Sequence, residues 1–148
     1  MVAKDYEARL RTLVENKTLH LSSFGPFFPS AHFPVFDLML LGIGKDGHLA
    51  SLFPNRPQRF EKNRWVTFIT DSPKPPPPRI TFTFPVIKSA TNIAMVVTGS
   101  DLADAVYKTL GGGGCGEHPP ITCAELQAEA EGELTWFLDK DAASKLHH

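Results

Sequence analysis

The sequence has no apolar run long enough to cross a membrane, no block of one charge and only two cysteines. A membrane helix needs about 20 consecutive apolar residues, so no membrane partner is expected. The 15 basic residues are spread along the chain and matched by 16 acidic ones, which argues against nucleic acid as a partner. Cys115 and Cys123 form no CxxC pair and no signal peptide is evident, so we expect two free thiols in a cytoplasmic protein.

The spacing of apolar residues predicts alternating strands and helices. Strands are expected at residues 36–41, 65–70, 80–84, 92–99 and 134–139. Helices are expected at residues 5–15, 48–53, 85–90, 100–110 and 140–146. This alternation indicates an α/β fold, with a mainly parallel sheet of about four or five strands and helices on its faces. Residues 1–146 are expected to form a single domain, and His147 and His148 are interpreted as a tag remnant.

One segment, LGIGKDGHLASLFP (residues 41–54), is hard to explain by folding alone. It follows FDLMLL, an apolar run typical of a strand buried on both faces. Glycines in the turn allow positive φ, while Asp46 and His48 stand at the carboxyl end of the strand, where open α/β sheets bind ligands. The alternative is a plain strand-to-helix turn, with Asp46 or Ser51 as a helix cap and His48 solvated.

A second segment combines four consecutive prolines, Pro75 to Pro78, with flanking cations. Proline fixes φ and lacks a donor, so this run predicts a stiff polyproline-II segment that holds Lys74 and Arg79 in place. Two alternatives remain: the run could be a ligand for SH3 or WW modules, and the two cations could be solvated surface charges.

LGIGKDGHLASLFP, followed by SPKPPPPRITFTFPVIKSA, VVTG and LTWFLDKDAA, resembles the 6-phosphogluconolactonases, which form a larger group with the glucosamine-6-phosphate deaminases. The resemblance covers nearly the whole chain but only the carboxyl-terminal part of the family domain. It implies a Rossmann-like fold truncated at the amino-terminal side, without the phosphate-binding loop and Asp-Glu-Arg type motif of the missing half. Leu49 departs from the family pattern, which usually has a small hydroxyl residue after the histidine.

The resemblance implies hydrolysis of 6-phospho-D-glucono-1,5-lactone to 6-phosphogluconate in the oxidative pentose phosphate pathway. Histidine titrates near neutral pH, so His48 is the expected base, and Asp46 is expected to orient its imidazole. The amides of Gly44 or Gly47 are expected to assist the developing oxyanion, although in the family an arginine from the missing half is the main stabiliser.

Binding of the sugar phosphate is expected to depend on cations. Lys74 matches the phosphate lysine of the family, and Arg79 is expected to add to the same patch. The mechanism requires no metal and no cofactor. Because the phosphate loop and the arginine are absent, the chain alone is expected to be weakly active or inactive.

Two other functions remain open. A deaminase-like isomerase shares the GxDGH core, although SPKPPPPR is the lactonase version of that segment. The chain could instead be a non-catalytic sugar-phosphate-binding or interaction module, which meets a partner through the proline run or an open sheet edge. Such an edge would also favour self-association.

Overall fold

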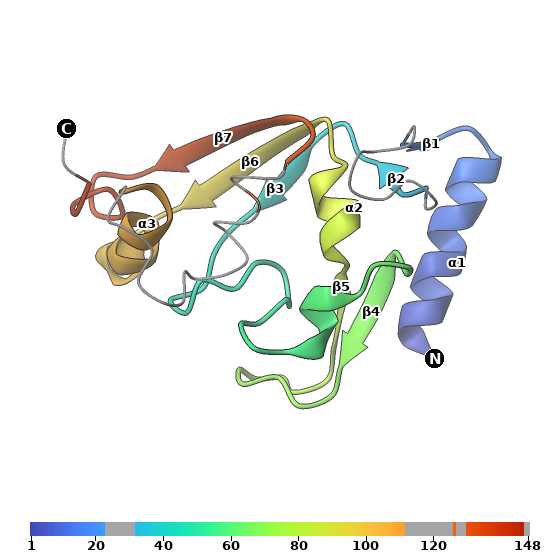
Figure 1. Cartoon of the computed structure of the whole chain (residues 1–148), viewed down its shortest axis with the longest axis horizontal. Helices are drawn as coiled ribbons and strands as arrows, with labels where there is room; N and C mark the ends of the chain where they lie inside the picture. Colours follow the sequence, from blue (N-terminus) through green and yellow to red (C-terminus); the bar gives the residue numbers. More distant parts are fainter. Residues whose placement is uncertain (23–31, 112–125, 127–129, 147–148) are drawn as a thin grey trace.

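The computed structural model describes residues 1–22, 32–111, 126 and 130–146 (Figure 1). Its elements in chain order are α1 (Val2–Glu15), β1 (His20–Leu21), β2 (Pro34–Val35), β3 (Met39–Leu41), the 3₁₀ turn η1 (Pro57–Phe60), β4 (Val66–Ile69), β5 (Arg79–Phe82), α2 (Phe84–Lys88), β6 (Asn92–Val97), the 3₁₀ turn η2 (Ser100–Leu102), α3 (Ala103–Leu110) and β7 (Glu133–Leu138). No helix in these ranges is both long and apolar enough to cross a membrane.

A parallel sheet of three strands, in the order β3-β6-β7, organises the molecule. The helices α2 and α3 lie on the same side of this sheet (Figure 1). Val86 and Ile87 of α2 share one core cluster with Ile93 and Met95 of β6. Val106 of α3 is fully buried in a second cluster, together with residues of β6 and β7. The predicted α/β class with a parallel sheet is confirmed.

Within the part of the chain that the structure describes, the parallel sheet is smaller than predicted and helices cover one of its two faces. Three strands are hydrogen-bonded in parallel within the described residues, rather than four or five. The run at residues 36–41 was expected to be buried on both faces, but its strand begins at Met39 and Leu40 is 70% exposed. The prediction of two buried faces is therefore wrong for this chain, because no described element packs over Leu40.

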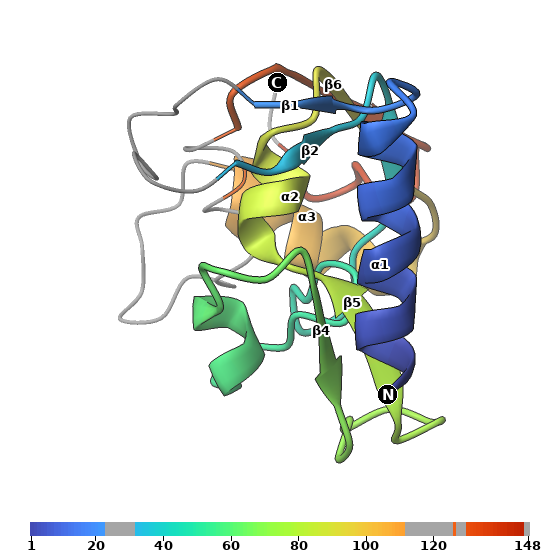
Figure 2. The ribbon, with the colours of Figure 1, turned by 90° about the vertical axis from the view of Figure 1, so that its right-hand side faces the viewer.

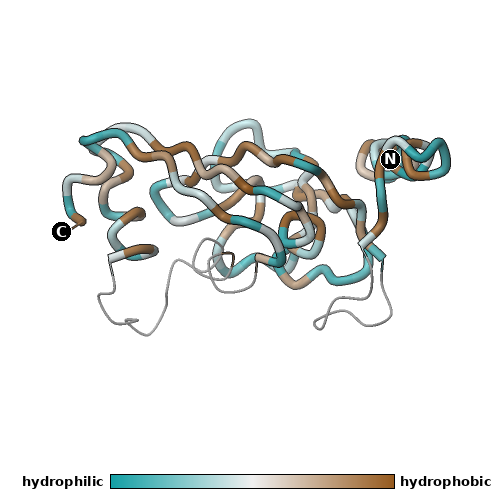
Figure 3. Tube along the Cα trace, turned by 90° about the horizontal axis from the view of Figure 1, so that it is seen from above, coloured by the Kyte–Doolittle hydropathy of each residue, from teal (hydrophilic) through white to brown (hydrophobic). Residues whose placement is uncertain are grey.

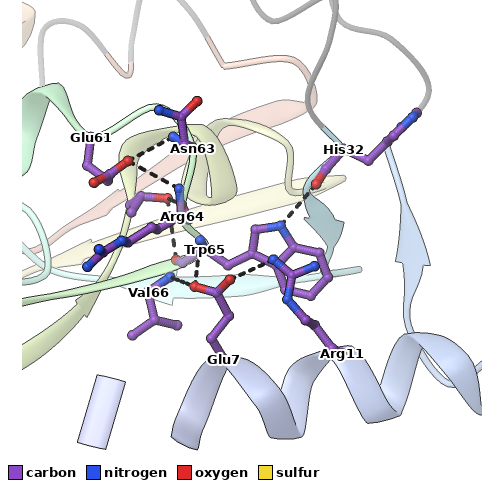
Figure 4. Close-up of polar contacts among 9 residues, drawn as sticks. Glu7, Arg11, His32, Glu61, Asn63, Arg64, Trp65 and Val66 are labelled. Atoms are coloured by element: carbon purple, nitrogen blue, oxygen red, sulfur yellow. Dashed lines mark hydrogen bonds and ion pairs between the residues drawn. The ribbon is translucent and has the colours of Figure 1, made fainter. Parts of the chain in front are cut away.

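The strands β4 and β5 form a separate antiparallel pair, and α1 lies alongside it (Figure 2). One carboxylate joins them: Glu7 Oε2 accepts hydrogen bonds from the amides of Trp65 and Val66 at 3.0 and 3.1 Å (Figure 4). Glu7 Oε1 accepts from Arg11 at 2.6 Å, and the Arg11 guanidinium lies 4.1 Å over the Trp65 ring. The helix is thus fixed to β4 by polar and aromatic contacts together.

Three predicted helices differ from the structure. Residues 48–53 form turns and isolated bridges instead of a helix, with Ala50 at φ 51°, a left-handed value that a helix cannot contain. The helix at 100–110 begins as η2, and Ser100 makes no side-chain cap. Residues 140–145 are turns rather than a frayed helix. The glycine-rich segment after α3, for which we expect a surface loop at residues 111–122, lies mostly outside the described residues, and so does the tag remnant.

The proline run is also different from the expected polyproline-II segment. The Ser72 amide donates to the Pro77 carbonyl at 3.1 Å, so residues 72–77 curl into a closed loop. The peptide bond between Pro75 and Pro76 is cis, whereas polyproline-II is built from trans bonds. Four prolines restrict φ, but the closure of the loop also depends on hydrogen bonds from Ser72 and Arg79. This loop, residues 71–78, is called the proline loop below.

Candidate active site

The carboxyl end of β3, at Leu41, is followed by a tight turn that carries Asp46 and His48. The Gly44 amide donates to the His48 carbonyl at 3.0 Å, and the Gly47 amide donates to the Gly44 carbonyl at 2.9 Å. Gly47 has φ 79°, a left-handed value that glycine adopts without a steric penalty. These two bonds close the turn and aim the short carboxylate and the imidazole toward each other.

Buried side chains beneath the turn fix its position. Leu49 and Leu52 are fully buried in the core that α2 and the sheet share. The Ser51 amide donates to the Thr81 hydroxyl of β5 at 3.1 Å, which ties the turn to the antiparallel pair. Phe53 is also buried, and its ring centroid lies 4.5 Å from that of His48. The His48 side chain is therefore only 14% exposed.

Asp46 and His48 form a close carboxylate–imidazole pair. Asp46 Oδ1 lies 2.5 Å from His48 Nδ1 and also accepts from the His48 amide at 3.3 Å. Burial raises the pKa of Asp46, but the hydrogen bonds and charge of His48, with a smaller contribution from Lys74, hold it below its ordinary value. An ionised carboxylate only accepts hydrogen bonds, so Nδ1 carries the proton and Nε2 is left as the basic nitrogen.

Lys74 reaches the same carboxylate from the proline loop. Its Nζ lies 3.8 Å from Asp46 Oδ1, and its side chain is 40% exposed. This distance is that of an ion pair rather than a short hydrogen bond. The ammonium therefore stands beside the imidazole and still faces solvent, although the two residues come from segments 26 positions apart.

Arg79, at the start of β5, holds the proline loop. Its Nη2 donates to the carbonyls of Lys74 and Pro75 at 3.0 and 2.8 Å, and its Nε donates to the carbonyl of Pro76 at 3.0 Å. The guanidinium also lies 5.6 Å over the ring of Phe53, which packs on His48. The structure therefore places Arg79 next to the site, with three of its hydrogen bonds committed to the backbone that carries Lys74.

Gly44 and Gly47 were expected to offer amides to an oxyanion, but both amides donate within the turn. An oxyanion would have to displace these bonds, so the glycines act here by shaping the turn. Gly44 shows this most directly: a Cβ at that position would collide with the His48 ring and lie 2.7 Å from Asp46 Oδ1. Only glycine lets the ring settle against this backbone.

Sequence reasoning missed two contributors to the site. Phe53 packs against the His48 ring, but nothing in the sequence distinguishes it from the other aromatic residues of the core. Lys45 pairs with Asp101 of η2 at 2.7 Å, so the turn is also tied to the loop after β6. The pairing of a cation and an anion 56 positions apart leaves no local signal in the sequence.

Leu49, which departs from the family pattern, is fully buried and forms isolated bridges with Ile43 and Leu52. Its side chain belongs to the core beneath the turn. A leucine at this position therefore contributes packing.

The arrangement combines an imidazole, a carboxylate in contact with it and a partly exposed ammonium. Such a set suits general-base attack of water on a substrate with a distant negative charge. Among the residues that the structure describes, no group of three or more histidine, cysteine, aspartate or glutamate side chains could hold a metal ion.

The chain is similar to known proteins of one family. A family model described as glucosamine-6-phosphate isomerases/6-phosphogluconolactonase matches residues 1–136. A relative from Oryza sativa subsp. japonica, named probable 6-phosphogluconolactonase 1, is 52% identical over 97% of this chain and 47% of its own length. The chloroplastic 6-phosphogluconolactonase 3 of Arabidopsis thaliana is 51% identical over 97% of this chain and 41% of its own length.

Solved structures give the same result. The 6-phosphogluconolactonase of Trypanosoma brucei matches with a TM-score of 0.78 and 31% identity, over 99% of this chain and 53% of that protein. This chain therefore spans about half the length of the relatives that it matches.

Proposed function

This chain belongs to the glucosamine-6-phosphate isomerase/6-phosphogluconolactonase family. We propose that it carries the general base, and the cation that binds the phosphate group, for hydrolysis of 6-phospho-D-glucono-1,5-lactone to 6-phosphogluconate in the oxidative pentose phosphate pathway. The observation that supports this is the position of one atom, Asp46 Oδ1. It lies 2.5 Å from the imidazole of His48 and 3.8 Å from the ammonium of Lys74.

The imidazole supplies the proton transfers. His48 Nε2 takes a proton from a water molecule as its oxygen attacks the lactone carbonyl carbon. Asp46, whose pKa lies below its ordinary value, stabilises the imidazolium that forms. When the tetrahedral intermediate collapses, the bond between that carbon and the ring oxygen breaks, and the imidazolium returns its proton to the ring oxygen. The product is the open-chain acid.

Lys74 supplies the charge that holds the substrate. At 3.8 Å from Asp46, its ammonium makes a loose ion pair that a phosphate dianion can replace with a stronger one. Arg79 supports this contact by fixing the carbonyls of Lys74, Pro75 and Pro76. Substrate positioning by Lys74 and Arg79 then brings the lactone carbonyl toward the imidazole.

The chain alone is expected to be a weak catalyst. The oxyanion stabiliser expected from the family resemblance lies outside it, and one such donor is typically worth about 10²–10³ in turnover. The amides of Gly44 and Gly47 do not replace it, because both donate within the turn.

The direct test is the rate of lactone hydrolysis above the spontaneous rate. We expect the unaltered chain to accelerate hydrolysis slightly and His48→Ala to abolish this acceleration. His20→Ala is the control and should retain it, because His20 is an exposed histidine of β1. Titration with 6-phosphogluconate provides a second readout, in which Lys74→Ala should lose binding. Equal acceleration by all three proteins, together with equal binding by Lys74→Ala, would refute the proposal.

The same preparations separate the lactonase from the deaminase-like isomerase. Ammonia release from glucosamine 6-phosphate should be absent if the lactonase assignment is right, and His48-dependent release would favour the isomerase. The non-catalytic module predicts ligand binding without any His48-dependent turnover. The cytoplasmic location stays a prediction, since several similar proteins are named chloroplastic. The absence of a nucleic-acid partner also stays a prediction.

A further inference from the structure

The ring of Phe53 contacts two parts of the candidate site. Its centroid lies 4.5 Å from that of the His48 imidazole, and the two ring planes are inclined by 37°. The guanidinium of Arg79 lies 5.6 Å from the centroid of the same ring, within the range of a cation–π contact. One aromatic side chain therefore contacts the base and also the residue that holds the proline loop.

Phe53 is fully buried, but it is not part of either apolar core cluster. It is 1% exposed, and among the described residues it is absent from both clusters, although Leu49 and Leu52 belong to the first one. Apolar stretches, brown in Figure 3, follow the strands of the parallel sheet, and side chains from these strands contribute to both clusters. The Phe53 ring packs instead on an imidazole and a guanidinium, two groups that stack well on an aromatic face.

Two contacts connect the segment after the turn to β5. The Ser51 amide donates to the Thr81 hydroxyl at 3.1 Å. The contact of Phe53 with Arg79 lies two positions later in the first segment and two positions earlier in β5. Arg79 in turn binds three carbonyls of the proline loop. The separation between the turn and the proline loop therefore depends on the Phe53 ring, which fills the space beside Arg79.

This separation matters because the substrate must reach two groups at once. His48 Nδ1 and Lys74 Nζ lie 2.5 and 3.8 Å from the same oxygen, Asp46 Oδ1. The number of bonds between the reacting carbonyl and the phosphate decides whether one molecule can contact the ammonium and also place its carbonyl at the imidazole.

We propose that Phe53 is a positioning residue whose ring holds the imidazole and sets the spacing between His48 and the proline loop. By this spacing it determines specificity, because it selects a six-carbon phosphorylated sugar acid over a shorter one. The inference rests on the proposed function, since it concerns the substrate of the same site.

The first test measures ligand selectivity by calorimetry in the unaltered chain, Phe53→Leu and Phe33→Leu. The ligands are 6-phosphogluconate, 5-phosphoarabinonate, which is one carbon shorter, and inorganic phosphate. The unaltered chain should prefer the longer acid by at least about tenfold, a typical effect of one carbon unit in a fitted site. Phe53→Leu should lose most of this preference and keep its affinity for inorganic phosphate. Phe33→Leu is the matched control and should keep the preference, because Phe33 is also 1% exposed but belongs to the first core cluster.

A second measurement needs no substrate. The Nδ1 proton of His48, which lies between the ring and Asp46, should give a downfield NMR signal protected from exchange with water, because the side chain is only 14% exposed. Phe53→Leu should remove this protection, and Phe33→Leu should retain it. Phe53→Met keeps a large flexible side chain without the aromatic face. It should behave as Phe53→Leu does, and it replaces that variant if Phe53→Leu does not fold.

The outcomes separate this inference from the proposed function. Retention of either the selectivity or the protected Nδ1 signal in the Phe53 variants would overturn the inference, and so would equal losses in Phe33→Leu. If Phe53→Leu retains both together with His48-dependent hydrolysis, the proposed function stands and the role of Phe53 is refuted. If the Nδ1 signal depends on Phe53 but no protein binds 6-phosphogluconate, the proposed function and the specificity are refuted, and the positioning of the imidazole stands.

Discussion

Asp46 connects the two chemical groups of the site through one oxygen atom. The carboxylate sets the tautomer of His48 at 2.5 Å and attracts Lys74 at 3.8 Å. Its pKa is raised by burial, but the neighbouring donors outweigh that effect and keep it below the ordinary value. Asp46 is therefore ionised throughout the neutral range, where its acceptor role requires the charge.

Asp46→Asn tests this role with little change of shape. The amide cannot stabilise an imidazolium and can present a donor to Nδ1, which favours the wrong tautomer. We expect the acceleration of lactone hydrolysis above the spontaneous rate to fall to the level of His48→Ala, while the affinity for 6-phosphogluconate changes little. Steady-state rates and calorimetry on the same preparation measure the two quantities. A loss of affinity with unchanged turnover would contradict the assignment.

Gly44→Ala tests the fit of the His48 ring against the turn. A Cβ at Gly44 would collide with the imidazole, so we expect the ring to move away from Asp46 and turnover to fall by at least about tenfold. Gly42→Ala is the matched control, because a Cβ there would meet the Val96 carbonyl at an ordinary 3.5 Å. The histidine NMR signals report the ring environment, and similar signals in both variants would argue against the collision.

The sequence predicts part of this residue-scale picture. Asp46 and His48 lie two positions apart in one turn, so their proximity follows from the chain itself. The contacts of Phe53 with His48 and of Lys45 with Asp101 depend on how other segments pack, and local pattern does not encode them.

At the scale of elements, the proline loop is positioned by its neighbours as well as by its prolines. Arg79 binds three of its carbonyls, and Arg56 of the preceding connection pairs with Asp71 at 2.5 Å. These contacts fix the backbone from which Lys74 extends. The sequence predicts instead a stiff polyproline-II segment that holds both Lys74 and Arg79 in place.

A double-mutant cycle separates positioning by Arg79 from direct binding. If Arg79 acts through Lys74, Arg79→Ala should weaken 6-phosphogluconate binding by about tenfold in the unaltered chain and have almost no effect in the Lys74→Ala background. Arg79→Lys should not rescue it, because lysine lacks the planar fork that spans three carbonyls. Independent, additive losses in calorimetry would instead indicate that the guanidinium contacts the phosphate.

Glu7→Gln tests how α1 is held on β4. The carboxylate accepts from two backbone amides and from Arg11, so the variant should lower the free energy of unfolding by about 1–3 kcal/mol. Glu15→Gln, an exposed change at the end of the same helix, is the control and should have almost no effect. Denaturant titrations at neutral pH provide the measurement.

The pH dependence of the same variant has a definite sign. Burial raises the pKa of Glu7, but the hydrogen bonds of Arg11, Val66 and Trp65 hold it below the ordinary 4.5. The stabilisation by the Glu7 carboxylate is therefore complete at pH values above its pKa in the unfolded chain. It is lost as the pH falls through its lower pKa in the folded chain. The difference in the free energy of unfolding between the unaltered chain and Glu7→Gln should decrease on going from about pH 7 to below about pH 4. A difference that increases in acid would contradict this.

The order and type of most elements could be predicted, because strands and helices leave apolar periods in the sequence. The helix α1 and the strands β4 to β7 lie where those periods placed them. The segment 48–53 has a helical pattern too, yet Leu49 and Leu52 are drawn into the core and Ala50 takes a left-handed conformation. Burial there outweighs the local preference for a helix.

At the scale of the whole molecule, four exposed apolar residues on one face of the parallel sheet should make the isolated chain associate with itself: Leu38, Leu40, Val96 and Phe137. Leu40, at 70% exposed, is the most exposed of the four, so Leu40→Lys should reduce the average mass seen by light scattering at high concentration. Phe60→Lys should reduce it less, because Phe60 lies on η1, outside this face. A strictly monomeric chain at all concentrations would contradict the prediction.

The sequence by itself determined the α/β alternation, the glycine turn and the pairing of Asp46 with His48, because each depends on residues close together in the chain. Tertiary structure alone decided that Lys74 meets the same carboxylate, that Arg79 holds the proline loop and that one sheet face stays open. Those features join segments tens of residues apart, and their geometry is fixed only when the core beneath the turn is packed.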